Sequence, residues 1–141
     1  MKYLLDTCII SEMQKNRPSK AVCDWLAARD EEDLYLSVLT LGEIQKGISR
    51  LSDGRKKAGL QSWLDRDLPD RFQSRIVEIN CAAALVWGQV TGESQRHGKP
   101  IPVIDALIGA TAIVIGATVI TRNDSDVMLT GAKTFNPWNN R

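Results

Sequence analysis

The chain has 141 residues, of which 43% are hydrophobic and 25% are charged, and its formal net charge at pH 7 is +1. These values are those of one ordinary globular domain, so we expect residues 1–141 to form a single domain that needs no disulfide or structural metal for stability. A net charge this close to zero neither indicates nor excludes a nucleic-acid partner, so any phosphate-binding surface has to be local.

Short apolar segments alternate with longer amphipathic segments along the chain. The predicted strands are residues 2–5, 34–38, 75–79, 117–121 and, at an edge, 133–135. The predicted helices are residues 19–29, 40–51, 55–68, 81–96 and 102–116, with a short turn or helix at 123–129. Pro69 is expected to end the helix at 55–68. Strands that alternate with helices imply crossover units, so we predict an α/β fold: a three-layer α/β/α domain with a central, mostly parallel sheet.

Carboxylates stand near the ends of these predicted elements. Asp6 directly follows the first strand, and Glu43 lies in the first turn of the helix after the second strand. Asp124 and Asp126 follow the β-branched strand at 117–121. Because parallel strands bring their carboxyl ends to one edge of a sheet, we expect these groups to gather there. Asp105 lies in the first turn of a helix that precedes a strand, so the pattern alone does not bring it to the others.

Each acid also has a purely structural explanation. Thr40-Leu-Gly-Glu43 matches a capping box, in which Glu43 would bond back to the Thr40 backbone. Asp105, like Asp124 and Asp126, would interact favourably with a helix dipole. Asp6 would cap the turn that leaves the first strand. These explanations hold well for single acids and less well for the group.

Several carboxylates at one edge of a sheet repel one another, and a divalent cation would neutralise them. Ligand sets made only of oxygen favour Mg²⁺ or Mn²⁺ over zinc. Such an ion polarises a phosphoryl oxygen and lowers the pKa of water, which is the chemistry that phosphodiester hydrolysis needs. The acids therefore favour a metal-dependent nuclease.

Other residue types narrow the chemistry. His97 is the one histidine, which excludes a mechanism with two histidines, and no glycine-rich phosphate loop is present. Cys8, Cys23 and Cys81 are widely spaced and form no zinc or thioredoxin motif, and free thiols suit a reducing cytosol. The apolar stretch at 106–120 is shorter than the ~20 residues of a membrane span. We expect a soluble, cytoplasmic protein with no membrane segment.

Four segments resemble, in order, the motifs of PIN-domain proteins, and together they cover the whole chain. They are Leu4-Leu-Asp6-Thr-Cys-Ile-Ile-Ser11, Thr40-Leu-Gly-Glu43-Ile, Pro102-Val-Ile-Asp105-Ala-Leu-Ile-Gly-Ala-Thr and Thr121-Arg-Asn-Asp-Ser-Asp126. The ending Phe135-Asn-Pro-Trp138 resembles the FitB-like branch of the VapC toxins. One such motif would be weak evidence, whereas four in order are specific.

This resemblance implies the toxin of a type II toxin–antitoxin system, acting as a Mg²⁺-dependent endoribonuclease with Mn²⁺ as an alternative ion. It also implies that Asp105 joins Asp6 and Glu43 in the catalytic, metal-binding site. The implied partners are a small, DNA-binding, VapB-like antitoxin that inserts a peptide into the active-site groove, a second copy of the chain in a homodimer, and tRNA or ribosomal RNA as substrate. DNA would be reached only through the antitoxin.

Two positions depart from the family pattern. Cys8 stands where the family often has asparagine, so we expect a polar contact near Asp6 to be lost. The last motif carries its acid either two or five residues after the threonine, and these positions are Asn123 and Asp126 here. We assign Asp126 as the fourth catalytic and metal-binding acid, Asn123 as a residue that holds a ligand or a water, and Asp124 as a further candidate. Together with Thr7, the last motif's Thr121 is expected to orient metal-bound waters.

Two other functions remain open from the sequence. The chain would be a weakly active or inactive subunit of an antitoxin-bound, DNA-binding regulatory complex, which Cys8 and the near-neutral charge favour slightly. It would alternatively be a housekeeping RNA-processing nuclease without a partner, which its small size disfavours.

Overall fold

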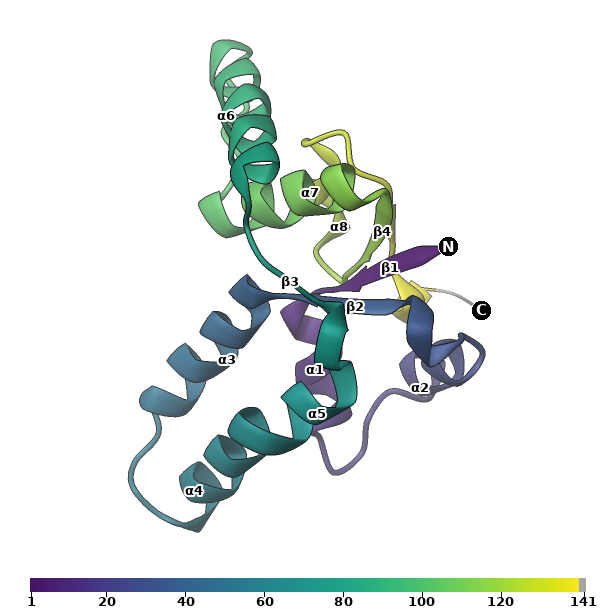
Figure 1. The fold of residues 1–141 in the computed structure, drawn as a ribbon, viewed down its shortest axis with the longest axis vertical. Coiled ribbons are helices and arrows are strands. Elements are labelled where there is room, and N and C mark those ends of the chain that lie inside the picture. Colours follow the sequence, from purple (N-terminus) through teal and green to yellow (C-terminus); the bar gives the residue numbers. More distant parts are fainter. Residues whose placement is uncertain (140–141) are drawn as a thin grey trace.

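The structure is a computed structural model that describes residues 1–139, so residues 140 and 141 of the predicted single domain lie outside the described part. Five parallel strands form one sheet in the order β3-β2-β1-β4-β5 (Figure 1). The strands are β1 (Lys2–Leu5), β2 (Leu34–Ser37), β3 (Ile76–Val77), β4 (Ala117–Ile120) and β5 (Thr134–Phe135). The prediction of an α/β fold with a mostly parallel sheet is confirmed, and the described sheet is parallel throughout.

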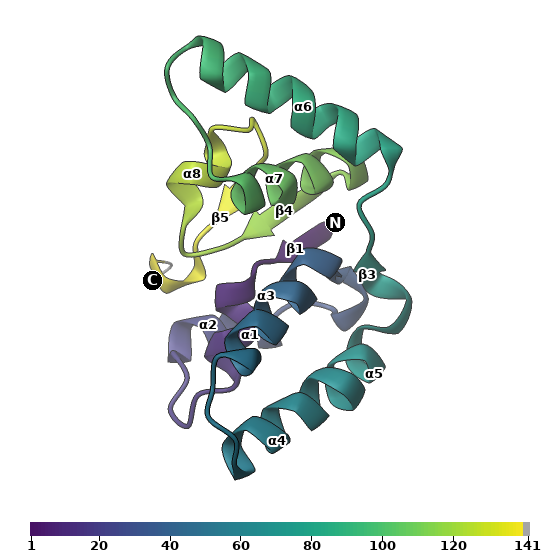
Figure 2. The same ribbon diagram turned by 90° about the vertical axis from the view of Figure 1, so that its left-hand side faces the viewer.

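Helices cover both faces of this sheet (Figure 2). Their bounds are α1 (Thr7–Met13), α2 (Lys20–Ala27), α3 (Val38–Ser49), α4 (Arg55–Ser62), α5 (Leu68–Phe72), α6 (Cys81–Arg96), α7 (Val103–Ile115) and α8 (Asp124–Met128). Short 3-10 turns follow at Glu31–Asp33, Gln73–Arg75 and Pro137–Asn139. Within residues 1–139, no helix is long and apolar enough to cross a lipid bilayer.

Alternation along the central strands divides the core into two clusters. Leu5 of β1 and Ile120 of β4 are fully buried on the face covered by α1, α2, α3 and α5. Leu4 and Val119, their chain neighbours, are fully buried on the opposite face, against α7 and α8. Helix α6 packs on the outer side of α7 (Figure 2). Because successive strand side chains point to opposite faces, apolar residues at consecutive positions are what a sheet buried on both sides requires.

The strand order reverses between β1 and β4, since β2 and β3 lie on one side of β1 while β4 and β5 lie on the other. Loops that leave the two strands at such a reversal diverge and open a crevice at the carboxyl edge of the sheet. Asp6 and Thr121 are the first residues after β1 and β4. The Asp6 N–H donates to the Ile120 carbonyl at 3.0 Å, so the two strands remain hydrogen-bonded up to the point where the crevice begins.

The start of α3 corrects one prediction. The helix begins at Val38 because Ser37 is its N-cap, with Ser37 Oγ accepting from the Leu39 N–H at 3.1 Å. Thr40 is therefore a fully buried residue inside the helix, and Glu43 lies in the second turn. Both the predicted first-turn position of Glu43 and the capping box are wrong, because Ser37, which was assigned to the predicted strand 34–38, caps the helix three residues before Thr40.

Pro69 does not end its helix as predicted. Helix α4 passes through a π-helical segment, Trp63–Asp67, and continues into α5 with Pro69 in the first turn. The Leu68 N–H donates to the Trp63 carbonyl, five residues back. This wider turn restarts the hydrogen-bonding pattern just before the proline, so that the missing proline N–H falls where no intrahelical bond is needed.

Candidate active site

Asp6 is almost fully buried at the crevice between β1 and β4 and is held through both of its oxygens. Asp6 Oδ1 accepts from the Thr7 N–H at 2.8 Å and so caps α1, which confirms its expected capping role. Asp6 Oδ2 accepts from the Thr121 hydroxyl at 2.7 Å. The second contact comes from the neighbouring strand's end, so the orientation of this carboxylate is fixed by two separate parts of the sheet.

Glu43 reaches the same region from α3. The Thr7 hydroxyl donates to Glu43 Oε1 at 2.5 Å and lies 3.4 Å from the hydroxyl of the buried Thr40. Thr7 thus links the carboxylate that caps α1 with the one on α3, since its N–H contacts Asp6 and its hydroxyl contacts Glu43.

Asp105 and Asp126 are joined by one amide group. Asn123 Nδ2 donates to Asp105 Oδ2 and to Asp126 Oδ2, both at 3.2 Å. The Asn123 N–H donates to Thr121 Oγ1 at 3.0 Å, which ties this group to the residue that holds Asp6. Asp124 opens α8 but has no side-chain hydrogen bond or ion pair among the described residues, so the structure does not join it to this network.

The charges of the four predicted acids act on one another. Burial raises the pKa of Asp105 from its ordinary 3.8 to about 6, and the negative charges of Asp6, Asp126 and Glu43 contribute to this rise. None of the ion pairs found within residues 1–139 includes any of the four. The structure therefore brings these carboxylates within electrostatic reach of one another, and none of them is paired with a side-chain cation of residues 1–139.

The donor set fits a hydrated divalent cation. Across the described residues, no group of three or more His, Cys, Asp or Glu side chains could hold a metal ion. Mg²⁺ does not require such a group, because it retains several waters and binds through one or two carboxylates. Oxygen donors with unbalanced negative charge are what such an ion prefers.

Cys8 is the residue for which the sequence motif predicts the loss of a polar contact to Asp6. Its thiol lies 3.8 Å from Asp6 Oδ2 and 3.7 Å from Thr121 Oγ1, and its sulfur accepts from the Arg122 N–H at 3.4 Å. Burial, and then the charge of Asp6, raise the pKa of this thiol, so it is present as a neutral S–H. The expected loss of a polar contact is thus only partial, since sulfur replaces it with a longer and weaker one.

A largely apolar groove of about 350 Å³ opens beside Thr7 and Glu43. It runs between α1, α3 and α4, with Ile44 and Trp63 among its apolar lining and Lys56 among its polar lining. The groove therefore places an apolar surface directly against one carboxylate of the site.

The raised pKa gives a pH-dependent prediction. An acid that binds its proton more tightly when folded destabilises the folded state once pH rises through the interval from 3.8 to about 6. Because Asp105 is partly exposed, solvent screening reduces this cost to about 1 kcal/mol. We expect a carboxyl ¹³C NMR titration of the metal-free protein to place the Asp105 pKa near 6 and Asp6→Asn to lower it. Asp124→Asn is the matched control, and an Asp105 pKa near its ordinary value would contradict this account.

Comparison with known proteins agrees with the fold. The PIN domain family model matches residues 3–129. The chain is 35% identical to Toxin FitB of Neisseria gonorrhoeae, over 96% of this chain and 97% of that protein. It is 31% identical to VapC ribonuclease Y4jK of Sinorhizobium fredii, over 96% of each. A solved structure of FitAB bound to a DNA fragment superposes with a TM-score of 0.91 and 33% identity, covering 99% of this chain and 97% of that one.

The chain therefore belongs to the PIN-domain family. The fold, the family match and the relatives also agree on a narrower group. Within the family the chain falls among the VapC/FitB-like toxins of toxin–antitoxin systems, which confirms the resemblance carried by its sequence motifs.

Proposed function

We propose that this toxin is an endoribonuclease that hydrolyses RNA phosphodiester bonds with the help of Mg²⁺ or Mn²⁺. One observation carries the proposal: hydrogen bonds through Thr121 and Asn123 join Asp6, Asp105 and Asp126 in one network, and within residues 1–139 no side-chain cation is paired to these acids or to Glu43. Burial, and then the charges of Asp6, Asp126 and Glu43, raise the pKa of Asp105 to about 6, as expected for such a network. A relative that is named a VapC ribonuclease supports RNA as the substrate class.

One or two of the four carboxylates would hold the hydrated ion directly, the others would attract it by their charge, and the residues between them would orient the carboxylates. When bound, the ion polarises a phosphoryl oxygen and lowers the pKa of the attacking water. The Thr121 hydroxyl donates a hydrogen bond to Asp6, and the Thr7 hydroxyl donates one to Glu43. Each threonine therefore fixes the direction of one carboxylate. Partners of this kind typically alter metal affinity or activity 10–100-fold when they are removed. We therefore assign the two threonines to the carboxylates rather than to waters.

Asn123 orients the other two carboxylates, those of Asp105 and Asp126. Its amide donates to both Asp105 and Asp126, which holds two like charges near each other before an ion arrives. A proton at Asp105 would compete with the ion for the same oxygens, so we expect ion binding to weaken as pH falls through about 6.

The proposed partner is an antitoxin, with DNA binding left to that partner. A solved structure of FitAB bound to a DNA fragment supports a DNA-binding complex of this kind. The apolar groove beside Glu43 is suited to an antitoxin peptide, because it offers buried apolar area next to the site. A homodimer and cytoplasmic action are part of the same proposal.

Metal removal tests the proposed activity. We expect the chain, freed of antitoxin by unfolding and refolded alone, to leave total RNA intact in EDTA and to cleave it when Mg²⁺ or Mn²⁺ is restored, with products followed on a denaturing gel. Cleavage that persists in EDTA would contradict a metal-dependent mechanism. A folded chain that cleaves no RNA with either ion would instead support the inactive subunit of a DNA-binding complex.

A further inference from the structure

Arg122 stands between Thr121 and Asn123, the two residues whose side chains contact Asp6, Asp105 and Asp126. We propose that Arg122 is a positioning residue: clamped by Glu12 and by the C-terminal segment Asn136–Trp138, it fixes the direction of the carboxylates through its two chain neighbours. The catalytic part of this inference rests on the proposed ribonuclease function, whereas the structural part does not.

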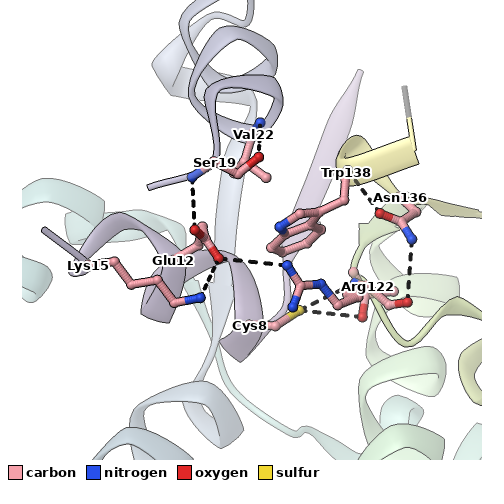
Figure 3. Close-up of polar contacts among 9 residues, drawn as sticks. Cys8, Glu12, Lys15, Ser19, Val22, Arg122, Asn136 and Trp138 are labelled. Atoms are coloured by element: carbon pink, nitrogen blue, oxygen red, sulfur yellow. Dashed lines mark hydrogen bonds and ion pairs between the residues drawn. The ribbon is translucent and has the colours of Figure 1, made fainter. Parts of the chain in front are cut away.

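The backbone of Arg122 is held from two sides (Figure 3). Its N–H donates to Cys8 Sγ in α1 at 3.4 Å, and its carbonyl accepts from Asn136 Nδ2 at 3.5 Å. These contacts come from segments that are far apart in the sequence. They restrain the peptide groups on either side of Arg122, which are the ones that determine where Thr121 and Asn123 point.

The side chain adds a third restraint. The Arg122 guanidinium lies over the Trp138 ring, 4.1 Å from its centroid, and Nη2 is 3.8 Å from Glu12 Oε1 (Figure 3). A cation over an aromatic face is attracted by the electrons of the ring, and most strongly by those of tryptophan. The guanidinium is therefore held between Glu12 and Trp138.

Glu12 is a firm anchor for this clamp. The residue is only 4% exposed, although glutamate is rarely buried unless it is paired. Its oxygens accept from Lys15 Nζ at 2.9 Å and from the Ser19 N–H at 2.8 Å, and these contacts lower the pKa of Glu12. Because Lys15 continues to neutralise Glu12 when Arg122 is removed, an Arg122 variant does not leave a buried charge without a partner.

The same contacts give the C-terminal segment Asn136–Trp138, which is part of the C-terminal motif, a structural role in holding Arg122. Asn136 Oδ1 accepts from the Trp138 N–H at 2.9 Å, so the motif folds back on itself while the Asn136 amide reaches the Arg122 carbonyl. Pro137 between them is buried. The motif thus presents both an amide and an aromatic face to one residue of the loop that follows β4.

The test compares Arg122→Met with Arg29→Met. Methionine keeps most of the aliphatic stem and removes the charge, and the Arg122 side chain is 56% exposed, so we expect both variants to fold. Arg29 is the matched control, because its guanidinium lies 4.6 Å from the Trp25 ring centroid yet makes no hydrogen bond to residues 121–123 in the described chain.

Three measurements separate positioning from other roles. In Arg122→Met we expect the ¹H–¹⁵N signals of the Asn123 side-chain amide to shift or broaden in the metal-free protein. We expect Mn²⁺ affinity, measured by calorimetry, to fall about tenfold, and kcat for RNA cleavage to fall about 10–100-fold with KM nearly unchanged. Arg122→Lys should recover part of each loss, since it restores a cation between Glu12 and Trp138. Arg29→Met should match the wild type.

Different failures have different meanings. An Arg122→Met protein with the wild-type Asn123 signals, Mn²⁺ affinity and kcat would overturn the inference. A raised KM with unchanged kcat, together with a smaller dependence of RNA binding on salt, would also overturn it and assign Arg122 to a direct phosphate contact. Wild-type protein that neither binds Mn²⁺ nor cleaves RNA would overturn the proposed function, while the Asn123 signals would still test the clamp.

Discussion

Asp105→Asn is expected to fold normally and to cleave RNA about 10²–10³-fold more slowly than the wild type, an effect of the size seen when one preorganised electrostatic contact to a reacting centre is lost. The substitution keeps the size and most hydrogen-bonding capacity of the side chain and removes one of the charges that would hold the ion. Asp6→Asn should behave in the same way. Single-turnover cleavage of a defined RNA, with saturating Mn²⁺, measures the loss.

The stability of the same variant distinguishes a site residue from a structural one. Because burial, and then the charges of Asp6, Asp126 and Glu43, disfavour the ionised form of Asp105, removal of its charge should raise the free energy of unfolding of the metal-free protein above pH 6 by about 1 kcal/mol. Urea unfolding at pH 7.0 and pH 5.0 tests this, with the full gain expected at pH 7.0 and only about half of it at pH 5.0, which lies midway between the two pKa values. Asp124→Asn should change neither property, and an Asp105→Asn protein that retains full cleavage would refute the proposed site.

Gly109→Ala is expected to lower the free energy of unfolding by about 3 kcal/mol, at the upper end of overpacking effects. Gly109 lies in α7, and a methyl group there would overlap Thr130 Oγ1 and lie 2.6 Å from Cγ2 and 2.7 Å from Cβ of the same residue. Thr130 cannot turn away cheaply, because it is buried and its hydroxyl donates to the Val127 carbonyl at 2.6 Å and accepts from the Ala132 N–H at 3.2 Å.

Gly92→Ala is the matched control for this prediction. Gly92 lies in α6, and a methyl group added there would meet no atom within 4 Å. Replacing a helical glycine by alanine where space is free typically stabilises a protein by about 0.5–1 kcal/mol. The two variants should therefore differ in sign, as measured by thermal and urea unfolding. Equal stabilities would mean that the loop at Thr130 yields to α7 at little cost.

The fold was largely predictable because its strands are short apolar runs between amphipathic helices. In chain order these runs match β1 to β5, with differences of a few residues at their ends. Helix α1 was not predicted, because Thr7-Cys-Ile-Ile is rich in residues that favour strands. Its helical conformation depends on the Asp6 cap and on the burial of Ile9 and Ile10, which only the folded chain supplies.

The site was predictable to different degrees for different acids. Asp105 was placed by resemblance alone. The sequence pattern did not place it at the site, on the ground that its helix precedes a strand. The structure shows why that ground was insufficient: a helix that connects two parallel strands runs opposite to them, so the first turn of α7 lies at the same edge as the ends of β1 and β4. The topology thus accounts for the proximity of Asp105 to Asp6.

Contacts that depend on tertiary packing were beyond the sequence. No local pattern shows that Glu12, in an unpredicted helix, is buried or that it meets Arg122 from a strand end more than a hundred positions away. The clamp therefore became visible only in the structure. A correct prediction of α1 would have placed Glu12 on the buried side of that helix. A charged residue at a buried helical position is the signal that would have indicated a partner for it.

The pairing of β1 with β4 also sets when the site can exist. Thr121, which holds one oxygen of Asp6, is made 115 positions later than Asp6 itself. At a synthesis rate of about 5–20 residues per second, this separation corresponds to an interval on the order of ten seconds. The nascent chain therefore lacks the contact that fixes Asp6 until β4 has been made, so the parallel sheet that assembles the site also delays its assembly to the end of translation.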